Sequence, residues 1–308
     1  MHRIAVIDLG TNTFNLLIAD VLNNTSKIIY TTKIPVRLGQ GGLSKNRIEQ
    51  DAFERGIYAL IKYRKLIDKH RVDRVFAFAT SAIRGAINKN EFIEMAKEQA
   101  KINIEAITGE READLIYKGV KHALKIGEQP ELIMDIGGGS TEFIIANDKN
   151  LYWKYSFLLG VSRLMEKFNP SDPIKEEEVS TIENYLETEL KPLFDALKQN
   201  PVNTLIGSSG SFDSFAEIIS NKYHSTDILK DKTEYTFNLN ECEVVFEEML
   251  RSTKKERLAI KGLIEMRVDM IVLSALLVKF VLKKTGIKNM RLSTYSLKEG
   301  VMWELINN

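Results

Sequence analysis

Asp8-Leu9-Gly10-Thr11-Asn12-Thr13 is repeated later in the chain as Asp135-Ile136-Gly137-Gly138-Gly139-Ser140, and the match continues without a gap from Phe14–Asp20 to Thr141–Asn147. In each copy an apolar run precedes the acid and a second apolar run follows the small residues. This order is typical of a strand, a tight turn and a second strand. The repeat therefore predicts two related β-hairpins that aim similar chemistry at one place.

The turn of each predicted hairpin has a composition that suits phosphate. Glycine and small hydroxyl residues let backbone N–H groups converge on one point without side chains in the way. An acid beside such a turn would repel phosphate unless a hard divalent cation lies between them, and Mg²⁺ commonly takes one or two carboxylates together with water and phosphate oxygens. Asp8 and Asp135 are therefore candidate cation ligands. The alternative is an ordinary hairpin whose Asp caps its own turn, which explains one copy more easily than two in register.

A third turn of similar composition follows another predicted strand. Thr204–Ile206 leads into Gly207-Ser208-Ser209-Gly210-Ser211 and then a helix from Phe212. A strand, a Gly/Ser turn and a helix N-terminus in this order bind anions well. Together the three turns predict a phosphate-rich ligand in a cleft between two related domains. The sequence contains no Walker P-loop, dinucleotide fingerprint or protein-kinase signature.

Length, charge and cysteine content exclude several classes of protein. At 308 residues with 44% hydrophobic content, the chain is long enough for two domains, and 43 Lys+Arg against 42 Asp+Glu predict neither a nucleic-acid partner nor a membrane partner. Cys242 is the only cysteine, which excludes an internal disulfide, and we expect it to be buried. Met1-His2-Arg3 leads into a strand without a secretory-signal pattern, and Met270–Leu282 is too short to span a bilayer. We therefore expect a cytoplasmic protein.

Strand and helix signals alternate along the chain, which predicts an α/β architecture with layered sheets. Beyond the hairpins, we expect strands at Ile28–Ile34, Arg74–Ala79, Ile104–Ile107, Leu151–Tyr155 and Asn289–Leu292. A glycine-rich loop, Val36–Leu43, follows the first of these. We expect helices at Ile48–Leu66 with Ser44 as its cap, near Asn90–Lys101, through Leu115–Ala123, at Lys175–Lys198 with a kink or interruption at Pro192, at Met270–Leu282 and at the C-terminus.

The sequence is similar to the exopolyphosphatase and guanosine pentaphosphate phosphatase family, within the superfamily of actin, sugar kinases and heat-shock chaperone ATPases. The resemblance spans nearly the whole chain and is most specific at Ile7–Phe14, Ala79–Arg84, Gly109–Gly119, Asp135–Glu142 and around Gly300. It implies an α/β fold of two duplicated ribonuclease-H-like (actin-like ATPase) domains with an interdomain cleft. The domains would be residues 1–117 and 118–295, with the C-terminal helix 296–308 packing back on the first.

The resemblance also implies roles for single residues. Glu112 would activate the attacking water, Glu142 would be the second catalytic acid and help to hold the metal, and Arg84 would clamp the terminal phosphate. Asp8 and Asp135 would coordinate Mg²⁺ directly or through water. Phosphate oxygens would be bound by residues of the three turns, namely Gly10, Thr11, Asn12, Thr13, Gly137, Gly138, Gly139, Ser140, Thr141, Gly207, Ser208 and Ser209. Arg37, Arg267 and Lys298 are weaker candidates, which we expect to be members of ordinary ion pairs.

The implied activity is Mg²⁺-dependent hydrolysis of the terminal phosphoryl group of inorganic polyphosphate or guanosine pentaphosphate, and the resemblance is compatible with a homodimer. One alternative is an ATP-dependent kinase or ATPase of the same superfamily, because fold does not fix function. Another is a sensor that binds polyphosphate or an alarmone without hydrolysis. Glu112 and Arg84 argue against the first alternative, and the presence of both Glu112 and Glu142 argues against the second.

The chain departs from the family pattern in two places. Many members have two adjacent glutamates followed by Ala and Arg, whereas this chain has Arg111-Glu112-Ala113-Asp114. We expect Asp114, in place of a cation, to alter substrate binding nearby. The third turn also lacks the Gly-Thr-Gly-Gly form of the family. The sequence therefore does not predict which of the two substrates is preferred.

Overall fold

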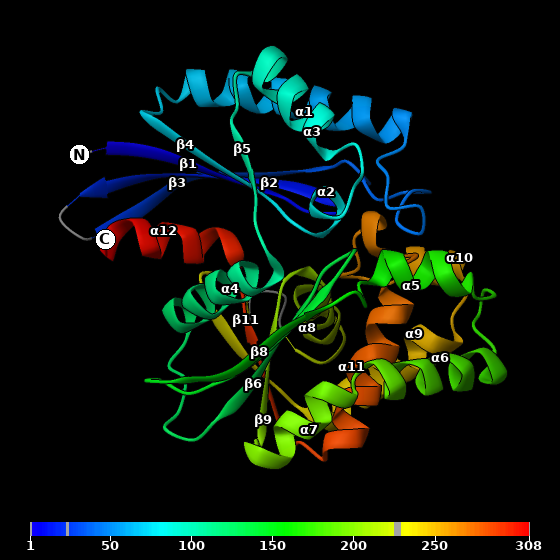
Figure 1. Ribbon diagram of the computed structural model, residues 1–308. Helices are drawn as coiled ribbons and strands as arrows, with labels where there is room; N and C mark the ends of the chain where they lie inside the picture. The colour runs from blue at the N-terminus through cyan, green and yellow to red at the C-terminus, as the bar shows by residue number, and fades with distance from the viewer. Residues whose placement is uncertain (1, 23–24, 225–228, 308) are drawn as a thin grey trace.

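The computed structural model describes residues 2–22, 25–224 and 229–307, which form two mixed β-sheets surrounded by helices (Figure 1). The first sheet has the order β3 (Thr25–Pro35), β2 (Thr13–Leu22), β1 (His2–Leu9), β4 (Arg74–Ala79) and β5 (Ile104–Ala106). The second has the order β10 (Glu234–Phe237), β11 (Asn289–Ser293), β9 (Thr204–Ser208), β6 (Glu131–Ile136), β7 (Thr141–Ala146) and β8 (Leu151–Phe157).

The two sheets have the same topology. In the first, β1 pairs antiparallel with β2 and parallel with β4, and β2 pairs antiparallel with β3. In the second, β6 pairs antiparallel with β7 and parallel with β9, and β7 pairs antiparallel with β8. β5 and β11 extend the two parallel sides, and β10 is an additional antiparallel edge strand. The predicted duplicated α/β fold is confirmed.

The helices cover the outer faces of the sheets and fill the space between them (Figure 1). α1 (Gln50–Lys69), α2 (Ser81–Arg84), α3 (Lys89–Met95) and the π-helical η1 (Ala96–Ala100) belong to the first half. α5 (Val161–Phe168), α6 (Glu176–Glu189), α7 (Lys191–Gln199), α8 (Gly210–Tyr223), α9 (Leu239–Arg251), α10 (Lys254–Leu258), η2 (Glu265–Arg267) and α11 (Ile271–Thr285) belong to the second. α4 (Gly109–Ala123) and α12 (Leu297–Asn307) lie between the two sheets.

The central strand of the first sheet is buried on both faces, which explains its unbroken apolar sequence. Because side chains alternate along a strand, Ala5 and Ile7 join a core with α1, whereas Ile4 and Val6 join a core with α4 and α12. That second core also takes side chains from the second sheet. A third core lies between the second sheet and its outer helices.

Two details differ from the sequence predictions. α1 begins at Gln50 with Glu49 at its N-cap, so Ser44 does not cap it. The helix expected near Asn90–Lys101 is α3 followed by the π-helical η1. The expected interruption of the long charged helix is confirmed, because α6 and α7 are separated at Leu190, and Pro192 lies in the first turn of α7, where its missing N–H costs no helical bond.

One prediction from composition is also confirmed. Cys242 is fully buried, and burial raises the pKa of its thiol to about 12, which makes it a poor nucleophile. No helix within the described ranges is long and apolar enough to span a membrane.

α4 and α12 cross in close contact through two glycines. A Cβ atom added to Gly119 would lie 2.0 Å from the carbonyl oxygen of Ser296, and one added to Gly300 would lie 1.8 Å from that of Leu115. Glu304 of α12 reinforces the crossing by accepting hydrogen bonds from Arg111 and Lys118 of α4. Hydrogen bonding to Arg111, with a contribution from Lys118, lowers the pKa of Glu304 to about 2. The predicted domain boundary at 117/118 falls inside α4, which is one continuous helix.

The substitution Glu304→Gln tests this crossing. We expect it to lower the free energy of unfolding by about 1 to 2 kcal/mol at pH 7, because Arg111 and Lys118 lose a charged acceptor. Since the folded-state pKa lies below the ordinary one, the stabilisation is complete above about pH 4.5 and is lost as the pH falls toward 2. Urea unfolding of both proteins at pH 7, 4 and 3 measures this. Glu187→Gln, at an exposed ion pair with Lys284, is the control, and an equal effect of both substitutions would contradict the prediction.

Candidate functional site

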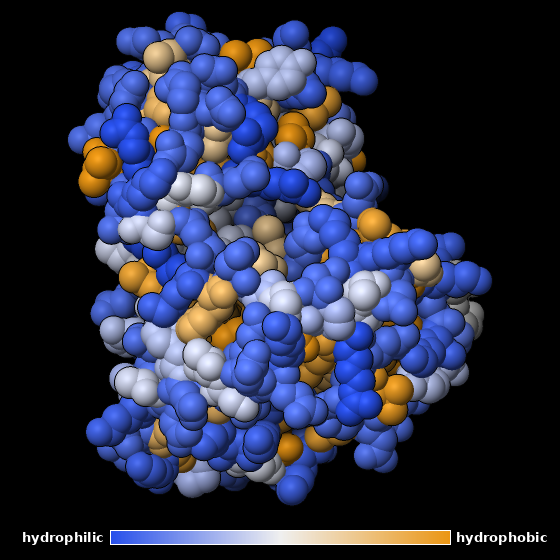
Figure 2. Space-filling view, turned by 90° about the vertical axis from the view of Figure 1, so that its right-hand side faces the viewer, coloured by the Kyte–Doolittle hydropathy of each residue, from blue (hydrophilic) through white to orange (hydrophobic). Residues whose placement is uncertain are grey.

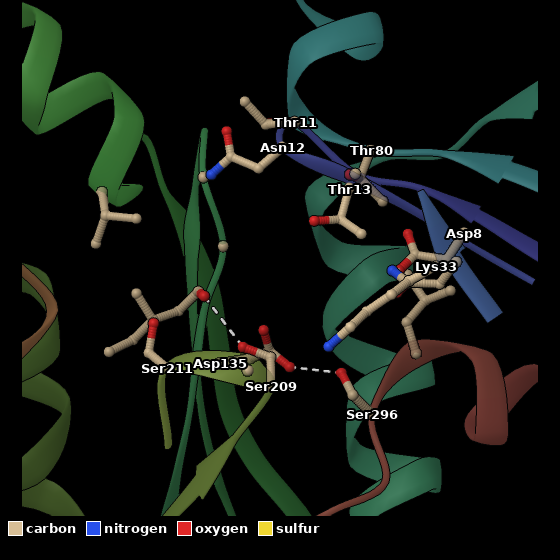
Figure 3. A pocket seen from close by; sticks show the side chains of 18 of the residues that line it. Asp8, Thr11, Asn12, Thr13, Lys33, Thr80, Asp135, Ser209, Ser211 and Ser296 are labelled. Atoms are coloured by element: carbon tan, nitrogen blue, oxygen red, sulfur yellow. Dashed lines mark hydrogen bonds between the residues drawn. The ribbon is translucent and has the colours of Figure 1, made fainter. Parts of the chain in front are cut away.

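A cavity of about 620 Å³ lies between the two halves and is lined by residues of both (Figure 3). Seen from the side that carries α5 and α10, the largely hydrophilic surface is hollowed between an upper and a lower part (Figure 2). The lining includes both hairpin turns, the start of α8, the start of α12 and part of β3. Among the predicted site residues, it contains Asp8, Gly10, Thr11, Asn12, Thr13, Glu112, Asp135, Gly137, Gly138, Gly139, Ser140, Glu142 and Ser209.

The two hairpin turns share one backbone geometry. The N–H of Gly10 donates to the carbonyl of Thr13 at 3.1 Å. In the same way, the N–H of Gly137 donates to the carbonyl of Ser140 at 3.0 Å. A Cβ atom at either glycine would lie 2.9 Å from the same carbonyl oxygen, so both positions require glycine. The repeat in the sequence is therefore also a repeat in conformation.

The tips of the two turns pack against each other. A Cβ atom at Gly138 would lie 2.6 Å from Nδ2 of Asn12, and one at Gly139 would lie 2.7 Å from Oγ1 of Thr11 and from Oγ of Ser81. The glycines of the second turn thus leave room for the side chains of the first. As a result, backbone and hydroxyl donors from both halves face one cavity.

Four predicted site residues do not line the cavity. Thr141 is fully buried, and its hydroxyl donates to the carbonyl of Leu159 at 3.0 Å. Ser208 is also fully buried and supports Asp135 from behind, while Gly207 packs closely against the ring of Phe212. Arg84 lies beside the site, and its Nη1 donates to Oε2 of Glu112 at 2.6 Å.

Asp8 and Asp135 face the same cavity from the two central strands (Figure 3). Asp8 accepts a hydrogen bond from Nδ2 of Asn15 at 3.0 Å, and burial raises its pKa to about 6. Oδ2 of Asp135 accepts bonds from the hydroxyls of Ser208 at 2.8 Å and Ser296 at 2.6 Å. Burial raises the pKa of Asp135 too, and these hydroxyls oppose the rise.

The donor set fits a hard cation that is shared with a ligand. Within the described part of the chain, no three Asp, Glu, His or Cys side chains gather closely enough to hold a metal ion. The carboxylates of Asp8 and Asp135 are hard oxygen donors on one cavity, and a cation such as Mg²⁺ can take its other ligands from phosphate and water. A metal held only by protein side chains does not fit here.

Glu112 and Glu142 form a second pair of carboxyl groups on the cavity wall. They are 7% and 1% exposed, respectively, and Oε1 of Glu142 accepts a hydrogen bond from Ser156 at 2.6 Å. Burial, and then the charge of Asp135, raises the pKa of Glu142 to about 7. Burial, and then the charge of Glu142, raises the pKa of Glu112 well above its ordinary value, although Arg84 opposes the rise. Such a pair can accept a proton near neutral pH.

Cationic side chains line the same cavity at positions that sequence reasoning ranked low or missed. Lys33 of β3 extends into the pocket in Figure 3, and it carries no motif that could have identified it. Arg267 lies against the N-terminus of α8, where a Cβ atom at Gly210 would be 1.4 Å from its Nη2. Lys298 makes the expected ion pair, with Oε1 of Glu299 at 2.8 Å, but it also lines the cavity.

Ser81, the first residue of α2, is a further donor facing this cavity. Its Oγ is buried, and among the described residues it has no hydrogen-bond partner. A buried hydroxyl without a partner is costly, so this atom is available for a ligand oxygen. The sequence placed Ser81 inside the family motif Ala79–Arg84, but only Arg84 was assigned a role.

Arg111 and Asp114, which depart from the family pattern, form ion pairs away from the cavity. Arg111 pairs with Glu304 of α12, and Asp114 pairs with Lys154 of β8 at 2.6 Å. Neither lines the cavity. The expectation that Asp114 alters substrate binding nearby is therefore not supported, because its carboxylate already has a cationic partner outside the site.

Ser209, in the third turn, has a backbone conformation that normally requires glycine. Its φ of 68° and ψ of 177° fall in a region that costs non-glycine residues about 1 to 3 kcal/mol. Its hydroxyl donates to the carbonyl of Ile136 at 3.0 Å. The strain lies at the point where the chain enters α8.

Two substitutions at Ser209 both remove the hydroxyl, so their difference in stability measures the cost of the backbone strain alone. We expect Ser209→Gly to be more stable than Ser209→Ala by about 1 to 2 kcal/mol, because only glycine adopts this conformation without strain. Denaturant unfolding of the two variants side by side measures the difference. An alanine variant as stable as the glycine variant would contradict the strained geometry.

The comparison with known proteins agrees with this arrangement. Residues 17–308 match the Ppx/GppA phosphatase family. The crystal structure of an exopolyphosphatase from Cytophaga hutchinsonii is 40% identical, with a TM-score of 0.96, and the match covers 99% of this chain and 98% of that one. Exopolyphosphatase 2 of Mycobacterium tuberculosis is 29% identical over 99% of both chains. A bifunctional 3-dehydroquinate synthase/phosphatase of Fusobacterium nucleatum is 32% identical over 92% of this chain, which spans only 43% of that protein.

The topology and these similarities confirm the two-domain actin-like ATPase fold that the resemblance implied. They also confirm the resemblance itself. With a family match over nearly its whole length, the chain belongs to the Ppx/GppA phosphatase family, whose members are hydrolases that are generally metal-dependent.

Proposed function

We propose that this chain is an exopolyphosphatase that removes the terminal phosphoryl group of inorganic polyphosphate or guanosine pentaphosphate. The observation that carries the proposal is that two equivalent glycine turns, one from each half, meet at a cavity that also holds the buried pair Glu112 and Glu142. The turns supply N–H donors for phosphate oxygens, and the pair supplies a base for water. The similarity to exopolyphosphatases supports the same substrate class.

Glu112 is the proposed general base. It takes a proton from a water molecule whose oxygen attacks the terminal phosphorus, while the bond to the bridging oxygen breaks and that oxygen keeps the bonding electrons. The products are orthophosphate and a chain shortened by one phosphate. Arg84 holds Glu112 through its 2.6 Å hydrogen bond, and its proposed role as a clamp on the terminal phosphate would use its remaining donors. Glu142 lies beside Glu112 and raises its proton affinity.

Mg²⁺ is the proposed cofactor, with Asp8 and Asp135 as its candidate protein ligands. Glu142, the third predicted ligand, would act on the ion through water, because no three carboxylates among the described residues gather closely enough to hold it together. When bound, the cation supplies positive charge to the phosphate oxygens. Before the ligand arrives, Asn15 orients Asp8, and Ser208 and Ser296 orient Asp135. Lys33, Arg267 and Lys298 add cationic charge along the cavity wall, which suits a polyanion. The cytoplasmic location and the homodimer stay predictions.

The two alternative functions differ from this proposal in the substrate that is turned over or in whether phosphate is released. A kinase or ATPase of the superfamily would turn over ATP faster than polyphosphate. A sensor would bind stoichiometrically and release no phosphate. The buried carboxyl pair favours hydrolysis over the sensor, because a binding protein has no need for two acids with raised pKa values in one cavity.

The substitution Glu112→Gln tests the proposed base. We expect kcat for phosphate release to fall by about 100- to 10,000-fold, with substrate binding retained, since Gln keeps the size of the side chain. The assay offers long polyphosphate, short polyphosphate, guanosine pentaphosphate and ATP in parallel, with Mg²⁺ and after its removal by a chelator. Glu110→Gln is the matched control, because Glu110 is an exposed residue in the same helical turn.

Full activity of the Glu112→Gln variant would exclude this glutamate as the base. ATP as the fastest substrate would favour the kinase or ATPase. Binding without phosphate release by the unaltered protein would favour the sensor.

A further inference from the structure

Each of the two phosphate-binding turns is held from behind by a segment of its own half. This segment follows β3 in the first sheet and β8 in the second. Behind the first turn, the N–H groups of Val36 and Arg37 donate to the carbonyl of Asn12 at 2.9 and 2.8 Å. The N–H of Gly39 donates to the carbonyl of Thr11 at 3.1 Å. Gly39 packs so closely here that a Cβ atom would lie 2.5 Å from Cγ2 of Thr11. The glycine-rich loop therefore supports the first turn.

The start of α5 supports the second turn in the equivalent way. The N–H groups of Val161 and Ser162 donate to the carbonyls of Gly137 and Gly138 at 3.0 and 2.8 Å. Nε of Arg163 donates to the carbonyl of Gly139 at 3.1 Å. All three glycine carbonyls of this turn are thus bonded to α5.

Two side chains of α5 join these supports across the cleft. Nη1 of Arg163 donates to the carbonyl of Leu43 at 3.0 Å, at the far end of the glycine-rich loop. Glu166 accepts from the N–H of Leu43 at 3.3 Å, from the N–H of Ser44 at 3.0 Å and from the hydroxyl of Ser44. We call Arg163, Glu166, Leu43 and Ser44 the clasp.

The clasp closes a continuous path between the two turns. The path runs from Thr11 through Gly39 and the loop to Leu43, and then through Arg163 to Gly139. One guanidinium therefore bonds a backbone carbonyl in each half of the protein. Arg163 is suited to this because its donors point in fixed directions in one plane. Ser44, predicted to be a helix cap, has its role here.

We propose that Arg163 and Glu166 are positioning residues that set the spacing of the two phosphate-binding turns, so that closing the cleft and assembling the site are one event. The proposal rests on the proposed phosphatase function, in which both turns hold one phosphate chain. Neither side chain lines the cavity, so each acts through the backbone that it holds. A shift of about 1 Å in such a site can cost about 100-fold in rate.

Arg163→Lys tests the clasp in the full chain. Lysine keeps the charge but has a single ammonium, which cannot reproduce the two directed bonds of the guanidinium. We expect kcat and kcat/KM for polyphosphate to fall together by about 10- to 100-fold, the pattern of an interaction that matters in the transition state. Glu166→Gln keeps one good acceptor and should give a smaller loss. Arg251→Lys, at an exposed arginine of α9, is the matched control and should change neither constant.

A distance measurement tests the clasp independently of activity. Spin labels at Tyr58→Cys on α1 and Leu258→Cys on α10 probe the two halves at exposed positions, in a Cys242→Ser background. We expect Arg163→Lys to widen the distribution of distances between the labels. If the variant folds as the unaltered protein does by circular dichroism but keeps its kcat and its distance distribution, the inference is wrong. If the unaltered protein releases no phosphate from any substrate, the proposed function fails, while the label distances still decide on the clasp.

Discussion

The close contact between α4 and α12 is the constraint on which the rest of the structure depends. Gly119 and Gly300 let the backbones approach so closely that a Cβ atom added to either would overlap a carbonyl oxygen, that of Ser296 just before α12 or that of Leu115 in α4. The pair lies between the two sheets and shares one core with both. Its thickness therefore sets the distance between the sheets. Because β1 and β6 both end at the cleft, that distance decides whether their turns can meet.

The chemistry of the site follows from this duplication. Each half brings the same elements to the cleft, namely a central strand with an aspartate one residue before its end, a glycine turn and a support behind the turn. Glu112 comes from the helix between the sheets and Glu142 from the second hairpin, and Arg84 of the first half donates a hydrogen bond to Glu112. Lys33, Arg267 and Lys298 add positive charge along the wall of the same cavity. A polyanion is the class of ligand that such a cavity accommodates.

The duplicated fold and most of the cavity lining were predictable from the sequence, because the acid and the turn residues of each repeat are neighbours along the chain. Other parts depend on geometry that a sequence motif does not contain. Thr141 and Ser208 belong to the motifs, but as buried strand residues they bond to neighbouring protein groups and do not line the cavity. Lys33 and Ser81 reach it only through the packing of distant segments. Arg111 and Asp114, which depart from the family pattern, each pair with a residue far along the chain.

The central claim is that the two turns together hold the end of one phosphate chain. The most direct measurement is a crystal structure of the Glu112→Gln protein with a short polyphosphate and Mg²⁺. The account predicts terminal phosphate oxygens within hydrogen-bonding distance of backbone N–H groups in both Thr11–Thr13 and Gly137–Ser140, with the cation at Asp8 and Asp135. A chain bound against one turn alone, or outside this cavity, would contradict it.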